Sequence, residues 1–157
     1  MNLRLRFIPI VLATLLVSCT GNDNSKTSSS MYEIPKEYEI NLADCLSQEE
    51  EQYLVFFHSE TCNHCKEIMG DVISFANENI TKTYFLNVSK PENKIEKCSK
   101  EELVVGIDKV EDLRILGTPT IVKVENGVTT ANVGGKEKCL TLLSEERKQD
   151  KSENTIA

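Results

Sequence analysis

The chain of 157 residues lacks a hydrophobic run long enough to cross a membrane. Its most apolar stretch, Phe7–Val17, has 11 residues, whereas a transmembrane helix needs about 20. It also has no internal repeat, and after its N-terminal segments about 115 residues remain, enough for one domain and too few for two. These absences exclude a membrane-spanning bundle and a repeat array.

Basic residues are in the minority and histidine is rare. The chain has 18 Lys and Arg against 25 Asp and Glu, a net charge of −7. An acidic chain argues against binding to nucleic acid and against electrostatic docking on anionic lipid. Its two histidines, His58 and His64, could join Cys62 and Cys65 in a zinc or copper site. No second Cys or His pair stands at the usual spacing, so this is a minor alternative.

The N-terminal segment predicts export. Arg4 and Arg6 precede the 11-residue apolar run, which is the pattern of a secretory signal. The run ends Leu16-Val17-Ser18-Cys19, which resembles the lipobox of bacterial lipoproteins, where the signal is cut before a lipid-bearing cysteine. Residues 1–18 are therefore predicted to be a lipoprotein signal peptide, and Cys19 the lipidation site. The alternatives are an ordinary signal peptide or a plain membrane anchor.

The rest of the chain divides by composition. Residues 19–30 are polar and without periodicity, which predicts a disordered tether. Residues 31–147 are predicted to form the folded domain, and 148–157 a flexible tail. Removing residues 1–18 with their two arginines changes the net charge from −7 to −9, so attachment to a membrane would rest on the lipid at Cys19, whose acyl chains contribute about 0.8 kcal/mol per buried methylene.

Periodicity predicts alternating strands and helices. A short helix is expected over residues 41–46. The Asn126-Gly127 step is a strong signal for a β-hairpin. The other expected elements are a strand over 53–57, a helix over 62–79, a strand over 83–88, a helix over 110–116, strands over 120–124 and 128–133, and a helix over 136–148. This order predicts a three-layer α/β sandwich with a mixed central sheet flanked by helices.

The stretch Cys62-Asn63-His64-Cys65 stands where the first long helix begins. A helix N-terminus carries partial positive charge and free N–H groups, which favour a thiolate. A cysteine pair at this place predicts a redox centre. Of the other cysteines, Cys45 could pair with Cys98 or Cys139, or all three could be small buried hydrophobic residues.

Together with Gly117-Thr118-Pro119-Thr120 and Gly134-Gly135, the Cys-x-x-Cys motif in this order of elements resembles the thioredoxin family. The resemblance covers residues 42–143. It implies that Cys62 is the attacking thiolate and Cys65 the resolving thiol. It also implies that Pro119 follows a cis peptide bond opposite the cysteines, and that the backbone of Thr118 pairs with an extended client segment.

The chain departs from the family pattern near the cysteines. Phe56 stands where many thioredoxins carry a buried acid, and Thr61 where tryptophan is usual. His58 occupies a position, expected in a loop, that is often aromatic. His64 between the cysteines resembles protein disulfide isomerases, with Asn63 in place of their glycine. A partly protonated imidazole there would favour the Cys62 thiolate and raise the reduction potential, so His64 and Asn63 are predicted to tune the pair.

These features predict an extracytoplasmic, lipid-anchored thiol–disulfide oxidoreductase that exchanges disulfides with protein clients. It would need no cofactor beyond the Cys62–Cys65 disulfide. Its expected partners are protein thiols and disulfides outside the cytoplasm and a membrane-embedded redox protein, and no nucleic acid. The alternative is an accessory lipoprotein of thioredoxin fold that binds one dedicated partner.

Overall fold

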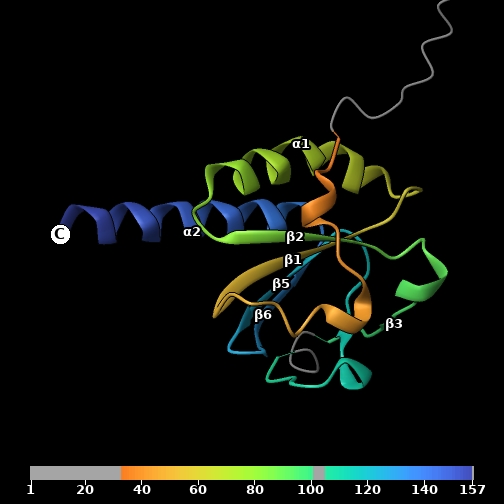
Figure 1. Cartoon of the computed structure of the whole chain (residues 1–157). Coiled ribbons are helices and arrows are strands. Elements are labelled where there is room, and N and C mark those ends of the chain that lie inside the picture. The colour runs from red at the N-terminus through yellow and green to blue at the C-terminus, as the bar shows by residue number, and fades with distance from the viewer. Residues whose placement is uncertain (1–32, 101–104, 157) are drawn as a thin grey trace, which may run out of the picture.

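The computed structural model describes residues 33–100 and 105–156 and has a mixed four-stranded sheet at its centre (Figure 1). The strand order is β2-β1-β5-β6. β1 and β2 are parallel, while β5 is antiparallel to both β1 and β6. The strands are β1 Gln52–His58, β2 Lys82–Asn87, β5 Thr120–Glu125 and β6 Val128–Gly134. The prediction of a mixed sheet is confirmed.

The connections explain the strand directions. The helix α1, Asn63–Glu78, carries the chain from β1 back to the start of β2, which makes these two strands parallel. A tight turn joins β5 to β6, and its residues Asn126 and Gly127 have positive φ angles of 51° and 77°. Positive φ at both positions is what a two-residue hairpin turn of type I′ requires. The predicted hairpin is confirmed.

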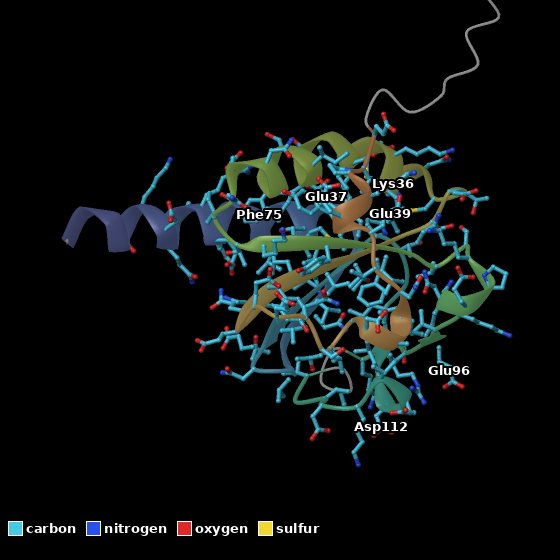
Figure 2. All side chains as sticks on the ribbon, viewed as in Figure 1. Lys36, Glu37, Glu39, Phe75, Glu96 and Asp112 are labelled. Carbon is cyan, nitrogen blue, oxygen red and sulfur yellow. A yellow bond between two sulfur atoms is a disulfide. The ribbon has the colours of Figure 1, made fainter. Side chains whose placement is uncertain are left out.

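Both long helices cover one face of the sheet (Figure 1). The α1 helix packs beside α2, which spans Lys136–Ile156 and so runs further than the end near residue 148 that periodicity predicts. Phe75 of α1, labelled in Figure 2, is fully buried, and the Arg147 guanidinium of α2 lies 5.2 Å from its ring centre. The buried residues on this face are Leu54, Phe56, Ile68, Val72, Phe75, Ala76, Phe85, Ile121, Cys139, Leu142 and Leu143.

Short, irregular segments cover the opposite face. They include the 3₁₀ turns Leu42–Asp44, Pro91–Asn93 and Val110–Asp112, and a second, two-stranded parallel sheet of β3, Glu96–Lys97, and β4, Arg114–Ile115. The first of these turns lies where a short helix is expected. The buried residues on this face are Cys45, Leu46, Tyr53, Val55, Phe57, Tyr84, Leu86, Leu113, Ile115, Val122 and Val124. The third layer is therefore built without a long helix among the described residues.

The helix predicted over 110–116 is wrong. Only Val110–Asp112 forms a 3₁₀ turn, and the chain then becomes β4. Leu113 and Ile115 are both buried, while Arg114 between them forms an ion pair with Glu96 of β3 at 2.8 Å. Alternation of buried and exposed residues with period two is the pattern of a strand. The seven residues also have apolar side chains at helical spacing, at Val110, Leu113 and Leu116, so the sequence fits both structures.

The chain before β1 pairs with the outer edge of β2. The Ile40 N–H donates to the Phe85 carbonyl at 3.0 Å, and Glu39 forms a parallel bridge with Phe85.

Within residues 33–100 and 105–156, no helix combines the length and apolar character of a membrane span. The predicted signal peptide, tether and lipidation site at Cys19 lie outside the described residues.

Candidate active site

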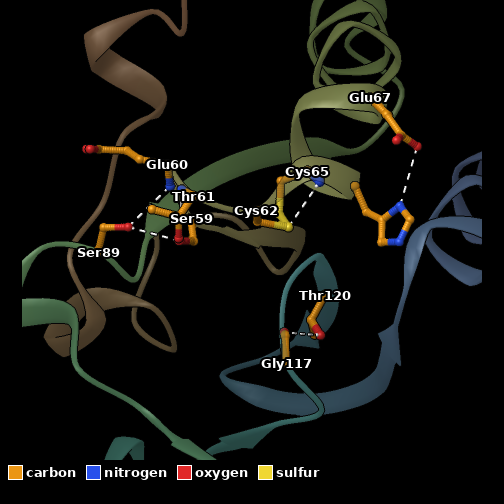
Figure 3. Close-up of a disulfide and its surroundings, with 10 residues drawn as sticks. Ser59, Glu60, Thr61, Cys62, Cys65, Glu67, Ser89, Gly117 and Thr120 are labelled. Atoms are coloured by element: carbon orange, nitrogen blue, oxygen red, sulfur yellow. Dashed lines mark hydrogen bonds and ion pairs between the residues drawn. A yellow bond between two sulfur atoms is a disulfide. The ribbon is translucent and has the colours of Figure 1, made fainter.

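The two cysteines at the start of α1 form a disulfide (Figure 3). Cys62 is the N-cap residue of the helix, and its Sγ accepts a hydrogen bond from the Cys65 N–H at 3.1 Å. Cys65 is fully buried, whereas Cys62 is partly exposed. After reduction, the same N–H and the positive end of the helix would stabilise a thiolate on Cys62. Of the two sulfur atoms, that of Cys62 is the one that a second protein can reach.

A network of hydroxyl and amide groups holds the loop that leads to Cys62 (Figure 3). Ser89 Oγ lies 3.0 Å from Ser59 Oγ and accepts the Glu60 N–H at 3.2 Å. Ser59 Oγ also contacts Thr61 Oγ1 at 3.2 Å, and the Asn87 amide donates to the Glu60 carboxylate at 3.0 Å. These contacts fix Thr61 where the family usually has tryptophan. Nothing in the sequence pattern predicts this network.

The segment before β5 forms the facing wall of the site. The Thr118–Pro119 peptide bond is cis, which confirms that prediction. Figure 3 shows Gly117 and Thr120 across from the disulfide. Thr120 Oγ1 donates to the Gly117 carbonyl at 2.8 Å and closes the turn. We name residues Gly117–Thr120 the client loop, after the role predicted for Thr118 and Pro119.

The end of β6 supports the client loop from behind. The Gly135 N–H donates to the Pro119 carbonyl at 2.8 Å. A Cβ atom placed on Gly134 would lie 2.7 Å from the Cβ of Leu116, so the loop approaches β6 too closely for any side chain there. The sequence resemblance includes Gly134-Gly135. In the structure, Gly134 leaves room for Leu116 and the Gly135 N–H holds the client loop by a hydrogen bond.

His64 lies at the exposed start of α1 and contacts a carboxylate on the next turn. Its Nδ1 is 3.4 Å from Glu67 Oε2, and the same oxygen accepts a hydrogen bond from Lys136 at 2.9 Å. The hydrogen bonds from Lys136 and then from His64 hold the pKa of Glu67 below its usual value. These contacts join the beginnings of α1 and α2 beside the disulfide. The predicted tuning by His64 and Asn63 stays a prediction.

His58 is buried at the end of β1, although the sequence predicts a loop there. Its side chain is 8% exposed and stacks on Phe56, with ring centres 5.7 Å apart and planes at 14°. Burial lowers the pKa of His58 to about 4, although the negative charges of Glu39 and Glu60 act to raise it. The imidazole is therefore neutral at pH 7. Phe56 itself is fully buried in the position where many thioredoxins have an acid.

The remaining cysteines of the described residues are free thiols. Cys45 and Cys139 are buried on opposite faces of the sheet, which excludes a bridge between them. Burial raises the pKa of each thiol to about 12. Cys98 is half-buried, and its thiol lies 3.5 Å from the Lys100 carbonyl. Within residues 33–100 and 105–156, no three His, Cys, Asp or Glu side chains are grouped as metal ligands.

Known proteins resemble the chain in fold. The crystal structure of Chlamydomonas reinhardtii thioredoxin f2 is 18% identical and aligns over 68% of this chain and 93% of its own, with a TM-score of 0.48. A mutant thioredoxin from Halobacterium salinarum is 18% identical over 70% and 87%, with a TM-score of 0.49. The complex of ferredoxin:thioredoxin reductase with thioredoxin f2 contains a chain 14% identical over 69% and 93%, with a TM-score of 0.50.

No protein-family model and no curated protein sequence matches the chain. The fold is nevertheless defined by its topology: the mixed sheet, the disulfide at the start of α1 and the cis peptide before β5 occur in the order that the sequence resemblance predicts. The chain has the thioredoxin fold, and the prediction of that fold is confirmed. Its Cys62–Cys65 disulfide has the arrangement of a thiol–disulfide oxidoreductase.

Proposed function

We propose that the protein is an extracytoplasmic thiol–disulfide oxidoreductase that acts on protein clients. The observation that carries this proposal is the different environment of the two cysteines in the disulfide. Cys62 caps the helix, is partly exposed and accepts the Cys65 N–H, while Cys65 is buried one turn deeper. An exposed, stabilised thiolate beside a protected second thiol is what stepwise disulfide exchange requires.

The exchange proceeds in two balanced steps. In the reductive direction, the Cys62 thiolate attacks one sulfur of a client disulfide, forming a mixed disulfide and releasing the other client sulfur as a thiolate. Cys65, after losing its proton, then attacks Cys62 Sγ. This step forms the Cys62–Cys65 disulfide and releases the second client thiolate. The client gains two electrons and the protein loses two; the oxidative direction is the reverse.

The client loop is proposed to seat the substrate. Thr118 lies immediately before Pro119 in the wall that faces the disulfide. An extended client segment would pair with the Thr118 backbone, as a short added strand, and so place its sulfur near Cys62. The hydrogen bond from Gly135, just after β6, to the Pro119 carbonyl would hold this wall in place.

The proposed location and redox partner rest on the N-terminal sequence. Cys19 after an apolar run favours lipid attachment outside the cytoplasm. There, reducing or oxidising equivalents would come from a membrane-embedded redox protein. Labelling of growing cells with a clickable fatty acid tests the attachment. The label is expected on the wild-type chain and lost in Cys19→Ser; equal labelling of both would contradict lipidation at Cys19.

Two assays test the activity. The reduced wild-type protein is expected to reduce insulin and to accelerate the refolding of scrambled ribonuclease, because both reactions begin with attack of the Cys62 thiolate on a client disulfide. Cys62→Ser is expected to abolish both activities. Cys98→Ser is the matched control, because it removes a half-buried thiol outside the Cys-x-x-Cys motif and should leave both rates unchanged. A wild-type protein that binds a partner but shows neither activity would favour the accessory role instead.

A further inference from the structure

Asn132 is a buried amide in β6. It is 4% exposed, and its Nδ2 donates to the Arg114 carbonyl at 3.1 Å. Its Oδ1 is buried and has no hydrogen-bond partner among the residues that the structure describes. A backbone carbonyl can only accept, so the amide nitrogen must face Arg114 and the oxygen must face the core.

A β-bulge brings Asn132 to this position. The register between β5 and β6 shifts at Lys123/Val124, so that Val124 lies opposite Thr129 and Val122 opposite Asn132. Val122 and Val124 belong to the core under the irregular face. The extra residue therefore turns Thr129 and Asn132, three positions apart, to the same buried face.

The bond from Asn132 reaches the strand that leads to the client loop. Arg114 begins β4, and Leu116 separates β4 from Gly117. On its other side, β4 is paired only with the two residues of β3 among the described part of the chain. The Asn132 amide thus ties β4 to the central sheet a few residues before the wall of the site.

Stability alone does not account for an amide here. A buried acceptor without a partner is costly, and an apolar side chain of similar size would avoid that cost. A hydrogen bond to a fixed carbonyl, by contrast, sets direction and distance, which apolar packing does not. The amide therefore has the properties expected of a group that positions β4.

We propose that Asn132 is a positioning residue that holds β4 and, through it, the client loop at the separation from Cys62 that an extended protein client needs. The inference rests on the proposed oxidoreductase function. Asn132 does not touch the client. Its loss should weaken the docking of protein clients while leaving the reactivity of Cys62 toward small disulfides unchanged.

Two matched substitutions on β6 test the proposal. Asn132→Leu replaces the amide by an apolar side chain of similar size. Thr129→Val does the same for a second buried hydrogen-bonding residue, because Thr129 Oγ1 accepts the Ile107 N–H at 2.9 Å and anchors the segment at Gly106 and Ile107 rather than β4. Both variants are compared with wild type in insulin reduction and in reaction with the small disulfide 5,5′-dithiobis(2-nitrobenzoate).

Asn132→Leu is expected to raise the KM for insulin about 3- to 10-fold, the effect of one hydrogen bond, with kcat and the small-disulfide rate unchanged. Its Tm should change little, because removing the unpaired Oδ1 stabilises the fold while the lost hydrogen bond to the Arg114 carbonyl destabilises it. Amide hydrogen exchange at Leu116–Thr118 should become faster. Thr129→Val should leave the KM and the exchange at Leu116–Thr118 unchanged.

Equal KM values in the two variants, or a parallel loss of small-disulfide reactivity in Asn132→Leu, would overturn the positioning role. So would unchanged hydrogen exchange at Leu116–Thr118. If the wild-type protein shows no activity on insulin or ribonuclease, the proposed function fails by itself. Hydrogen exchange, which needs no turnover, then still decides whether Asn132 holds the loop.

Discussion

The two faces of the central sheet are built differently, and each supplies one wall of the candidate site. On one face, α1 and α2 pack as regular helices and α1 presents Cys62. On the other, 3₁₀ turns and the short β3–β4 sheet cover the core, and β4 leads into the client loop. The Cys62 sulfur thus stands at the start of a regular helix, whereas the surface proposed to recognise clients follows an irregular segment.

This difference has a physical consequence for the site. A helix fixes its first turn through its own backbone hydrogen bonds and through the core beneath it. The client loop has no such element of its own: it is closed by the Thr120 hydroxyl and contacted by the Gly135 N–H, and the β4 strand that leads into it is tied to β6 by the Asn132 amide. We expect substitutions in the core to affect the reactivity of Cys62 less than they affect the binding of clients at the client loop.

The largest expected effect compares neighbouring phenylalanines on β1. Phe56 packs under the helices, edge-to-face with Phe85 at 5.9 Å, and Phe57 packs under the irregular face; both are fully buried. Phe56→Ala should lower the free energy of unfolding by about 4–5 kcal/mol and Phe57→Ala by about 3, because irregular segments collapse more readily into a cavity. Urea unfolding measures both. A larger loss for Phe57→Ala would break the comparison.

The next effect is a pH dependence from His58. Its folded pKa is about 4 and its ordinary value 6.5, so between these values the unfolded chain binds more protons than the folded one. Stability is therefore complete above pH 6.5 and is lost as the pH falls toward 4, by up to about 3 kcal/mol. The neighbouring charges are Glu39, Glu60 and Lys90.

Urea unfolding at pH 7 and pH 4.5 checks this prediction. His58→Phe keeps an aromatic ring against Phe56 and removes the proton site, so its stability should fall less than that of wild type over the same interval. Carboxylates elsewhere titrate equally in both proteins. Parallel curves for the two proteins would contradict burial of a neutral imidazole at this position.

A smaller effect is expected where the client loop meets β6. Gly134→Ala places a Cβ 2.7 Å from the Leu116 Cβ and should cost about 1–3 kcal/mol of folding free energy, since both sides are held in place. Thermal unfolding measures the loss. Adding Leu116→Gly removes the opposing atoms, so the double variant should lose less than the sum of the single ones. Strict additivity would show that the two residues do not press on each other.

The smallest effect concerns the exposed pairing of the two helices. Arg147 donates to both carboxylate oxygens of Glu78, at 2.7 and 2.8 Å. Glu78→Gln should cost only about 0.2–1 kcal/mol, because the pair is solvated, and the difference should shrink in about 1 M salt. Chemical unfolding in low and high salt measures it. A cost above about 2 kcal/mol would mean that this ion pair, rather than the apolar core, holds α2 on α1.

The helical face is predictable from sequence, and the irregular face is not. The strand over 53–57 and the helix after Cys62 have unambiguous periodicity, and the Cys-x-x-Cys motif marks their junction. The cis bond at Pro119 follows from the resemblance. By contrast, residues 110–116 fit both a helix and a strand, and seven residues cannot decide between the periods.

The supports of the client loop are also hidden from sequence reasoning. The sequence does not show that Asn132 shares a buried face with Thr129, because that arrangement depends on the bulge on β6. His58 is expected in a loop from the resemblance to the family, yet β1 extends through it. Both depend on strand register, which a single sequence does not fix.

The most direct test of the central claim is the capture of mixed disulfides with Cys65→Ala. Without the resolving thiol, a client should remain covalently attached to Cys62, as an adduct that a reductant releases and that mass spectrometry assigns to this residue. The double variant Cys62→Ser/Cys65→Ala should capture nothing. Adducts on Cys98 in place of Cys62, or equal capture by both variants, would contradict the assignment of Cys62 as the attacking thiolate.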